Sequence, residues 1–288
     1  MAREGNFTRA ADSLLLSQSA LTITIHQLEE DIGASLFNRT TRQVNLTVGG
    51  ENFLPVAQRL LEDFDRAMSD ARVGASRRSG RVDIAVLPSV AIRLMPGILE
   101  RLHESNPGIR VVLRDDNARG VHRQVRHNEV DFGISNLWQP SPELQFTPLT
   151  RDRFGLVCRA DHPLAREQGP VSWRELQDSP LFIMAADTGV YTAIQAAEAL
   201  PDWVRSPAGE VLAMVTLVEM IRAGLGITVL PELAEPSHSD PALAFRKLVN
   251  PTVEREICIV SRKNHTLSPA AKTAWDMIFA YVPRSAEV

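Results

Sequence analysis

The sequence predicts a mixed α/β protein with a small helical unit, one long helix, and a larger α/β region of two lobes. Three observations lead to this prediction. Closely spaced helical patterns fill residues 6–47, and one long helical pattern covers about residues 50–73. After residue 81, short apolar runs alternate with helical stretches, which is typical of βαβ units and parallel sheets. The runs are residues 82–87, 109–113, 131–135, 154–158, 227–230 and 257–261.

The composition is that of an ordinary folded protein. Of 288 residues, 44% are hydrophobic and 23% are charged, which excludes a disordered or collagen-like chain. No apolar run approaches the ~20 residues of a membrane-spanning helix, and no signal peptide follows Met1, so we expect a cytoplasmic protein without a membrane partner. The net charge of −4 gives no sign of a nucleic-acid partner, since such proteins are usually basic.

The N-terminal unit is predicted to contain two short helices. The first is expected to use Thr8 as its N-cap and to turn Ala10, Ala11 and Leu14 inward, where the two alanines permit a close crossing. A turn over residues 15–17 follows, and Ser17 is a suitable N-cap for the second helix. One face of that helix should meet a core, because its apolar residues share one stripe: Leu21, Ile25, Leu28 and Ile32.

The opposite face of the second helix carries side chains that can reach base edges in a DNA major groove. They are Gln18, Ser19, Thr22, Ile23 and His26. Residues 36–47 then predict a β-ribbon with Arg39 and Arg42 near its tip, suited to phosphate or minor-groove contact. The alternative is an ordinary α-domain whose outer residues are merely solvated. The pattern alone leaves both interpretations open.

Residues 6–47 resemble the winged helix-turn-helix of the LysR-type transcriptional regulators. The shared positions are Ala10-Ala11, Ser17-Gln18-Ser19-Ala20, Leu28-Glu29, Gly33, Leu36-Phe37, Arg39, Arg42 and Leu46-Thr47. The similarity continues at residues 160–165 and 224–231, so it covers essentially the whole chain. It implies a DNA-binding domain at residues 1–48, a linker helix and hinge at 49–80, and a two-lobed, periplasmic-binding-protein-like effector domain at 81–288.

The helix face, the wing and the resemblance together predict the DNA contacts. They are Ser17, Gln18, Ser19, Thr22, Ile23, His26, Arg39 and Arg42. Two departures stand out. Family members have about fifteen further residues before the equivalent of Gly5, and we expect the first helix that these residues form to be missing here. Ile23 stands where many members carry Arg, so we expect an apolar contact there, such as one with a thymine methyl group.

The long helix carries a stripe with the 3.5-residue period of a coiled coil. Its members are Phe53, Ala57, Leu60, Phe64, Ala67 and Ala71. An amphipathic helix packed on its own domain is the alternative, but the short N-terminal unit offers Leu60 and Phe64 little to pack against. We therefore expect a homodimer, and the resemblance extends this to a homotetramer. Residues 74–81, rich in Gly, Ser and Arg, are expected to form a polar, flexible linker.

A ligand of an open α/β sheet binds beyond the carboxyl ends of its strands, which points to residues 88–90 and Asn136. Ser89 precedes a helix expected to run to about Ser105, where it could hold a carboxylate or serve as a plain N-cap. Residues 187–190 form the matching loop in the second lobe, and the resemblance places small-molecule effectors between the two loops. The candidate effector contacts are Ser89, Asn117, Asn136, Thr188 and Gly189.

Other chemistry finds little support in the sequence. Cys158 and Cys258 lie in apolar runs, where a buried, inert thiol is usual; the alternative, a redox switch, needs an electropositive setting. We find no nucleophile elbow, phosphate-binding loop or zinc-helix histidine spacing. We therefore predict no enzymatic activity, cofactor or metal.

The overall prediction is a transcriptional regulator that binds double-stranded DNA under the control of a small-molecule effector, a carboxylate being one candidate. A solute-binding protein with the same two lobes is the alternative, although it would need an export signal. An α/β enzyme would need a reactive constellation of residues.

Overall fold

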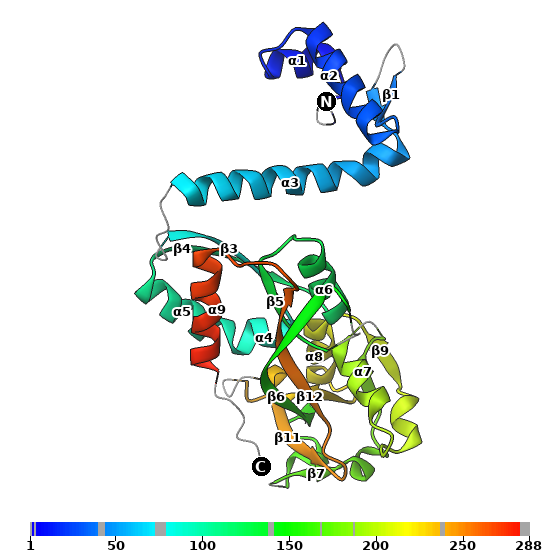
Figure 1. Cartoon of the computed structure of the whole chain (residues 1–288). Helices are drawn as coiled ribbons and strands as arrows, with labels where there is room; N and C mark the ends of the chain where they lie inside the picture. The colour runs from blue at the N-terminus through cyan, green and yellow to red at the C-terminus, as the bar shows by residue number, and fades with distance from the viewer. Residues whose placement is uncertain are drawn as a thin grey trace. The chain divides into compact units, whose positions relative to one another are not determined.

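The N-terminal unit begins with a helix that is capped differently from the sequence prediction. In the computed structural model, which describes residues 2, 4–39, 44–72, 79–137, 141–167, 169–186, 188–236 and 240–282, α1 spans Phe7–Ser13 (Figure 1). Its N-cap is Asn6, whose side chain accepts from the amides of Thr8 and Arg9 at 2.8 and 3.1 Å. The prediction of Thr8 as N-cap is wrong, because Asn6, an equally good capping residue, already has the extended backbone of a cap.

The second helix, α2 (Gln18–Ile32), begins as predicted. The Ser17 hydroxyl accepts from the Ala20 amide at 3.2 Å, and Gly33 ends the helix in the left-handed conformation that suits glycine. Leu21 is buried with Ala10 and Ala11. The predicted inward position of Leu14 is wrong, because α1 ends at Ser13 and Leu14, its C-cap, is 56% exposed. Ile25 packs on this small core, but Leu28 and Ile32 are 37% and 39% exposed. The predicted core stripe is therefore wrong in its second half, because the seven-residue α1 covers only the first turns of α2.

A two-stranded wing and the long helix complete the unit. Strands β1 (Phe37–Arg39) and β2 (Val44–Leu46) pair antiparallel, which confirms the predicted β-ribbon. The Glu29 carboxylate of α2 accepts from the amides of Leu36 and Phe37 at 2.8 and 3.1 Å and so fixes the wing to the helix. The long helix is α3 (Val48–Arg72).

The start of α3 is anchored tightly to the wing. The Thr47 hydroxyl donates to the Ser35 carbonyl at 2.6 Å and accepts from the Gly50 amide at 2.9 Å. A Cβ at Gly50 would lie 2.1 Å from the Leu36 carbonyl oxygen, so no larger residue fits there. At the neighbouring Gly49, a Cβ would find ordinary contacts at 3.5 and 3.6 Å.

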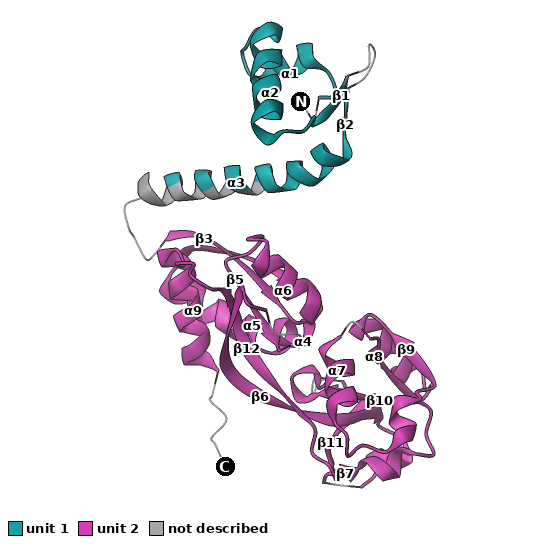
Figure 2. Cartoon of the chain, turned by 45° about the vertical axis from the view of Figure 1, so that its right-hand side comes forward, with its two compact units in different colours: residues 1–74 teal, residues 75–288 magenta. Residues whose placement is uncertain are grey.

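The chain divides into two compact units, residues 1–74 and 75–288 (Figure 2). The second unit begins with β3 (Ser79–Val86). Ser79, Gly80 and Arg81 therefore belong to a strand, paired in parallel with β4 (Gly108–Asp115), and not to the predicted linker; residues 73–78 lie outside the described part. Gly80 has φ +147° and approaches Ala270, where a Cβ would lie 2.9 Å from the alanine Cβ. This close approach explains a glycine inside a strand.

The described strands of the second unit form one ten-stranded sheet that extends through two lobes. All six predicted apolar runs coincide with strands, except that Leu87 and Asp131 lie one residue outside β3 and β5. The strand order is β4-β3-β5-β12-β6-β10-β8-β9, with β11 pairing β6 and β7. The remaining strands are β5 (Phe132–Asn136), β6 (Leu144–Arg159), β7 (Val171–Ser172), β8 (Leu181–Met184), β9 (Gly209–Val211), β10 (Ile227–Pro231), β11 (Leu243–Val249) and β12 (Glu254–Arg262).

The predicted parallel pairing holds only for part of each lobe. β3 runs parallel to β4 and β5, and β8 runs parallel to β9 and β10. β12 pairs antiparallel with β5, and β6 pairs antiparallel with β10 and β11. β6 and β12 also pair antiparallel over nine residue pairs, because the chain leaves the first lobe along β6 and returns along β12. Single-sequence periodicity does not report strand direction, so it missed this crossing.

Helices cover the sheet of each lobe. In the first lobe, the predicted single helix from Ser89 to Ser105 is two helices that meet at Leu94, because Pro96 cannot donate an interior helix hydrogen bond. The helices of this lobe are α4 (Pro88–Arg93), α5 (Met95–Ser105), α6 (Ala118–Arg126) and α9 (Pro269–Tyr281). The second lobe has α7 (Gly189–Ala196) and α8 (Met214–Arg222), with short 3-10 turns at Pro163–Ala165, Trp173–Leu176, Asp202–Arg205 and Glu232–Ala234. No helix in the described ranges is both long and apolar enough to cross a membrane.

We expect Gly50→Ala to destabilise the first unit by about 1 to 3 kcal/mol, since the added methyl group must displace backbone atoms. Gly49→Ala is the matched control, and it should be neutral or stabilising by at most about 1 kcal/mol. Urea unfolding followed by far-UV circular dichroism measures the effect. Tryptophan fluorescence serves as a readout of the second unit alone, because all four tryptophans follow residue 81. Equal midpoints for both variants would contradict the tight contact.

Candidate functional site

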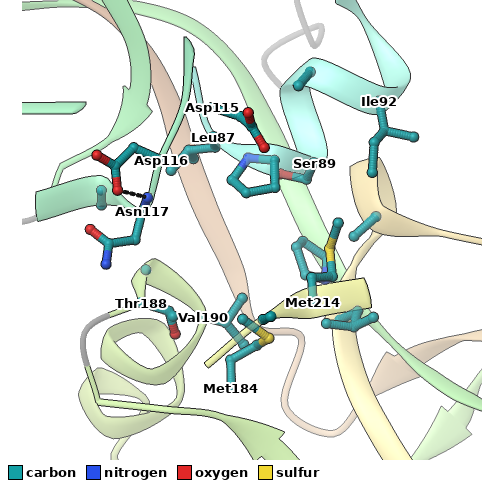
Figure 3. Close-up of a pocket in the computed structure, with 18 of the residues that line it drawn as sticks. Leu87, Ser89, Ile92, Asp115, Asp116, Asn117, Met184, Thr188, Val190 and Met214 are labelled. Carbon is teal, nitrogen blue, oxygen red and sulfur yellow. Dashed lines mark hydrogen bonds between the residues drawn. The ribbon is translucent and has the colours of Figure 1, made fainter. Parts of the chain in front are cut away.

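The second unit contains a cavity at the carboxyl ends of the strands of both lobes (Figure 3). Leu87 and Ser89, which follow β3, line it together with Asp115, the last residue of β4. Met184 ends β8, and Leu212 follows β9 on the opposite side. The cavity volume is about 410 Å³, which is in the range of small-molecule sites.

Buried polar groups converge on one end of this cavity. The Arg255 side chain of β12 is only 7% exposed and donates from Nε and Nη2 to Asp152 Oδ2 of β6, at 3.0 and 2.8 Å. Its Nη2 also donates to the Ser89 hydroxyl at 2.7 Å. Asp152 accepts through Oδ1 from the Leu233 amide at 3.0 Å. We call Ser89, Arg255 and Asp152 the buried network.

The buried network decides between the two interpretations of Ser89. Leu87 is the N-cap of α4, so the plain-cap interpretation is wrong, and Ser89 lies inside the first turn. Its oxygen accepts from Arg255, and its own proton has no acceptor among the residues that the structure describes. Arg255 Nη1 likewise has no partner within the described ranges. The Ser89 hydroxyl and the two N–H groups of Arg255 Nη1 are therefore available as donors to a ligand.

Sequence reasoning missed Arg255 and Asp152. A signal was available for Arg255, because a strand places alternate residues on one face. Arg255 has the same parity as Ile257 and Ile259, both buried, while Glu254 and Glu256 point outward. An arginine on the buried face of a strand needs partners, and the register pairs it directly with Asp152.

The second lobe contributes the start of α7. The Thr188 hydroxyl caps this helix by accepting from the Tyr191 amide at 3.3 Å, and it donates to the Ala185 carbonyl at 2.8 Å. Thr188 and Gly189 both line the cavity, as the sequence suggested, whereas Asp187 lies outside the described residues. The one proton of Thr188 is already used, so this side chain can only accept from a ligand.

The two predicted asparagines occupy different places. Asn117 lines the cavity and caps α6, with its Oδ1 accepting from the Gly120 amide at 2.8 Å. Asn136 is buried outside the lining and lies against Gly189, where a Cβ would be 2.2 Å from Asn136 Oδ1. The end of β5 thus contacts the start of α7 across the cleft. His122 Nε2 lies 3.1 Å from the Asn136 carbonyl oxygen, and burial lowers the pKa of His122.

Two acidic residues that the sequence analysis did not single out also line the cavity. Asp116 accepts from the Asn117 amide at 2.8 Å and from Gln124 Nε2 at 3.0 Å. Asp115, the last residue of β4, is exposed, and its carboxylate has no hydrogen bond or ion pair within the described part of the chain. Most other lining residues are apolar: Leu87, Ile92, Met184, Val190, Leu212, Met214, Val215 and Leu230.

In the first unit, the predicted DNA-contacting face of α2 is open to solvent. Gln18, Ser19 and His26 are exposed, and Ile23 is 65% exposed. The Thr22 hydroxyl donates to the Gln18 carbonyl at 2.8 Å and so keeps only acceptor capacity. The Ser17 and Ser19 hydroxyl oxygens share a hydrogen bond at 3.0 Å, and His26 Nδ1 lies 3.3 Å from Glu30 Oε1. Arg42 and the side chain of Arg39 lie outside the described residues.

The two cysteines are free and buried, as the sequence predicted. Cys158 of β6 and Cys258 of β12 are fully buried. Burial raises the pKa of Cys158 to about 11 and that of Cys258 to about 12. Both thiols are therefore protonated at neutral pH and lack the thiolate that redox chemistry requires. Within the described residues, no group of three or more His, Cys, Asp or Glu side chains is placed to hold a metal ion.

Comparisons with known proteins point to one family for both units. Residues 1–51 match the family of bacterial regulatory helix-turn-helix proteins of the lysR family, and residues 75–282 match the LysR substrate binding domain. The uncharacterized HTH-type transcriptional regulator YbhD of Escherichia coli is 34% identical over 94% of this chain and 86% of its own length.

Solved structures share the fold, and a second relative matches most of the chain. Full-length CbnR complexed with its target DNA has a TM-score of 0.70, with 21% identity over 98% of this chain and 96% of that one. A hydrogen peroxide-inducible genes activator of Dickeya chrysanthemi is 27% identical over 93% of this chain and 88% of its own length.

Proposed function

We propose that α2 binds the base edges of DNA and that the cavity binds a small carboxylate-bearing effector. The premise is that this chain belongs to the LysR family of bacterial transcriptional regulators. As a member of this family, the chain is a DNA-binding transcriptional regulator with an effector-binding domain. The observation that carries the effector proposal is the buried network, which holds Ser89 and Arg255 as fixed donors in a cavity of metabolite size.

The DNA proposal rests on the exposed outer face of α2. Its contacts are Ser17, Gln18, Ser19, Thr22, Ile23 and His26, with Arg39 and Arg42 of the wing as phosphate or minor-groove contacts. The exposed Ile23 side chain supports an apolar contact with a thymine methyl group. Because double-stranded DNA is the partner, we place the protein in the cytoplasm. We also infer that it is not an enzyme, since its relatives are transcriptional regulators.

We further propose that α3 forms a dimer interface. Leu60 and Phe64 of the 3.5-residue stripe are 63% and 62% exposed, although such residues normally avoid water. Phe53 and Ala57 are half-buried, and the side chains of Ala67 and Ala71 lie outside the described part. A partner helix would bury Leu60 and Phe64 and present two reading units to two half-sites of an operator. A homotetramer would need further contacts through the effector domains.

Mutations of the residues that contact bases and of those that contact phosphates should have different effects on DNA binding. We expect Gln18→Ala to lose about 1 to 3 kcal/mol of discrimination between operator and random DNA, with an unchanged salt dependence of binding. Arg42→Ala should weaken binding to both DNAs equally and lower the salt slope by about one for each phosphate that is no longer neutralised. Fluorescence anisotropy at several salt concentrations measures both quantities. An unchanged operator preference in Gln18→Ala would refute the assignment of the reading face.

Charge on the α3 stripe should dissociate the dimer. We expect Leu60→Asp and Phe64→Asp to give monomers, since each would bury an unpaired carboxylate against a partner helix. Gln58→Asp adds the same charge to an exposed position off the stripe and should leave the mass unchanged. Light scattering coupled to gel filtration reports the mass. Oligomers that persist in both stripe variants would assign the stripe to another role.

Effector binding should depend on Ser89. We expect thermal-shift screening of the full chain against small aliphatic and aromatic carboxylates to find ligands that raise the melting temperature. The stabilisation is about 2.7 kcal/mol at a hundredfold excess over Kd. Ser89→Ala should abolish these shifts, whereas Ser105→Ala, at an exposed serine outside the cavity, should retain them. Shifts that survive Ser89→Ala would place the ligand elsewhere.

A further inference from the structure

The charges that line the cavity do not suit a simple anion. Among the described residues, three charged side chains line it: Asp115, Asp116 and Arg255. The positive charge of Arg255 is already balanced by the buried Asp152, which accepts from two of its nitrogens. The cavity therefore presents an excess of negative charge, although one end of it offers donors to an oxygen.

The two carboxylates of the lining differ in what they can still bind. Asp116 is occupied by the Asn117 amide and the Gln124 amide group, and Arg123 lies 3.8 Å away. Asp115 has no such partner within the described residues, and both of its carboxylate oxygens remain available. Asp115 is exposed, so a ligand that reaches it exchanges water for its own donor, and a protonated amine supplies the opposite charge.

Asp115 lies close to the donors of the buried network. The register pairs Val86, near the end of β3, with Asp115 at the end of the neighbouring strand β4. Ser89 follows three residues after Val86, and Figure 3 shows Asp115 and Ser89 at the same end of the cavity. An acceptor for a cation and two donors for an oxygen thus lie together, and the apolar side chains of Met184, Leu212 and Met214 line the rest.

We propose that the effector carries a protonated amine next to its carboxylate, as an amino acid does, and that Asp115 binds this amine. The inference rests on the proposed function, since it names the chemical class of the ligand in the same cavity. The carboxylate accepts from the Ser89 hydroxyl and Arg255 Nη1, the ammonium group donates to Asp115, and an apolar side chain fills the remaining volume. Charge-assisted hydrogen bonds of this kind add more affinity than neutral ones.

The test uses matched ligands that differ only in the head group. Isothermal titration of the full chain compares L-leucine with 4-methylpentanoate and 3-methylbutylamine, and L-phenylalanine with 3-phenylpropanoate and 2-phenylethylamine. We expect at least one amino acid to bind about tenfold or more tightly than its amine-free acid and its carboxylate-free amine. Asp115→Asn should remove the advantage over the acid. Asp178→Asn, which neutralises an exposed carboxylate outside the cavity, should keep it.

Three results would overturn the proposed ligand class: amine-free acids that bind as tightly as the amino acids, an advantage that survives Asp115→Asn, or no binding of any of the six probes at millimolar concentration. If the amine-free acids bind and Ser89→Ala abolishes this binding, only the proposed need for an amine is contradicted, and the proposed effector site stands. Binding of the amino acids that is unchanged in Ser89→Ala would instead contradict the site itself.

Discussion

The buried ion pair between Arg255 and Asp152 is the constraint on which the cleft depends. The two residues face each other across β6 and β12, the strands that carry the chain from one lobe to the other. Each is almost fully buried, so removing one partner would leave an unpaired charge, at a cost of about 3 to 5 kcal/mol. The same pair holds Ser89 in place, and therefore the structural connection between the lobes and the polar end of the cavity share one set of atoms.

The first unit achieves rigidity by different means. Few of its described side chains are buried, and its geometry is fixed by hydrogen bonds and close backbone contacts. Glu29 ties the wing to α2 by accepting from two consecutive amides, and Thr47 ties the wing to α3. At Gly50, helix and wing approach until only a hydrogen atom fits between them. The direction in which α3 leaves the wing is thus set by backbone contacts.

Local features were predictable from the sequence, and features that depend on distant segments were not. The Ser17 cap, the β-ribbon and six strands of the second unit follow from short-range patterns, and the structure contains them. The position of Ser89 at a strand end was also predictable, but its partner Arg255 lies 166 residues away, and only the fold brings them together. The exposure of Leu28 and Ile32 depends on the length of a neighbouring helix, and strand direction depends on how the lobes connect. A single sequence carries no direct record of either.

The contact between Asn136 and Gly189 limits how closely the two lobes can approach each other at one edge of the cleft. These residues touch with no room for a methyl group, so the two lobes cannot approach further along this edge. The width of the cleft at this edge is therefore set by a contact within the protein. A ligand too large for this width would have to separate Asn136 from Gly189 in order to bind. Selection by size is built into the frame, separately from selection by charge.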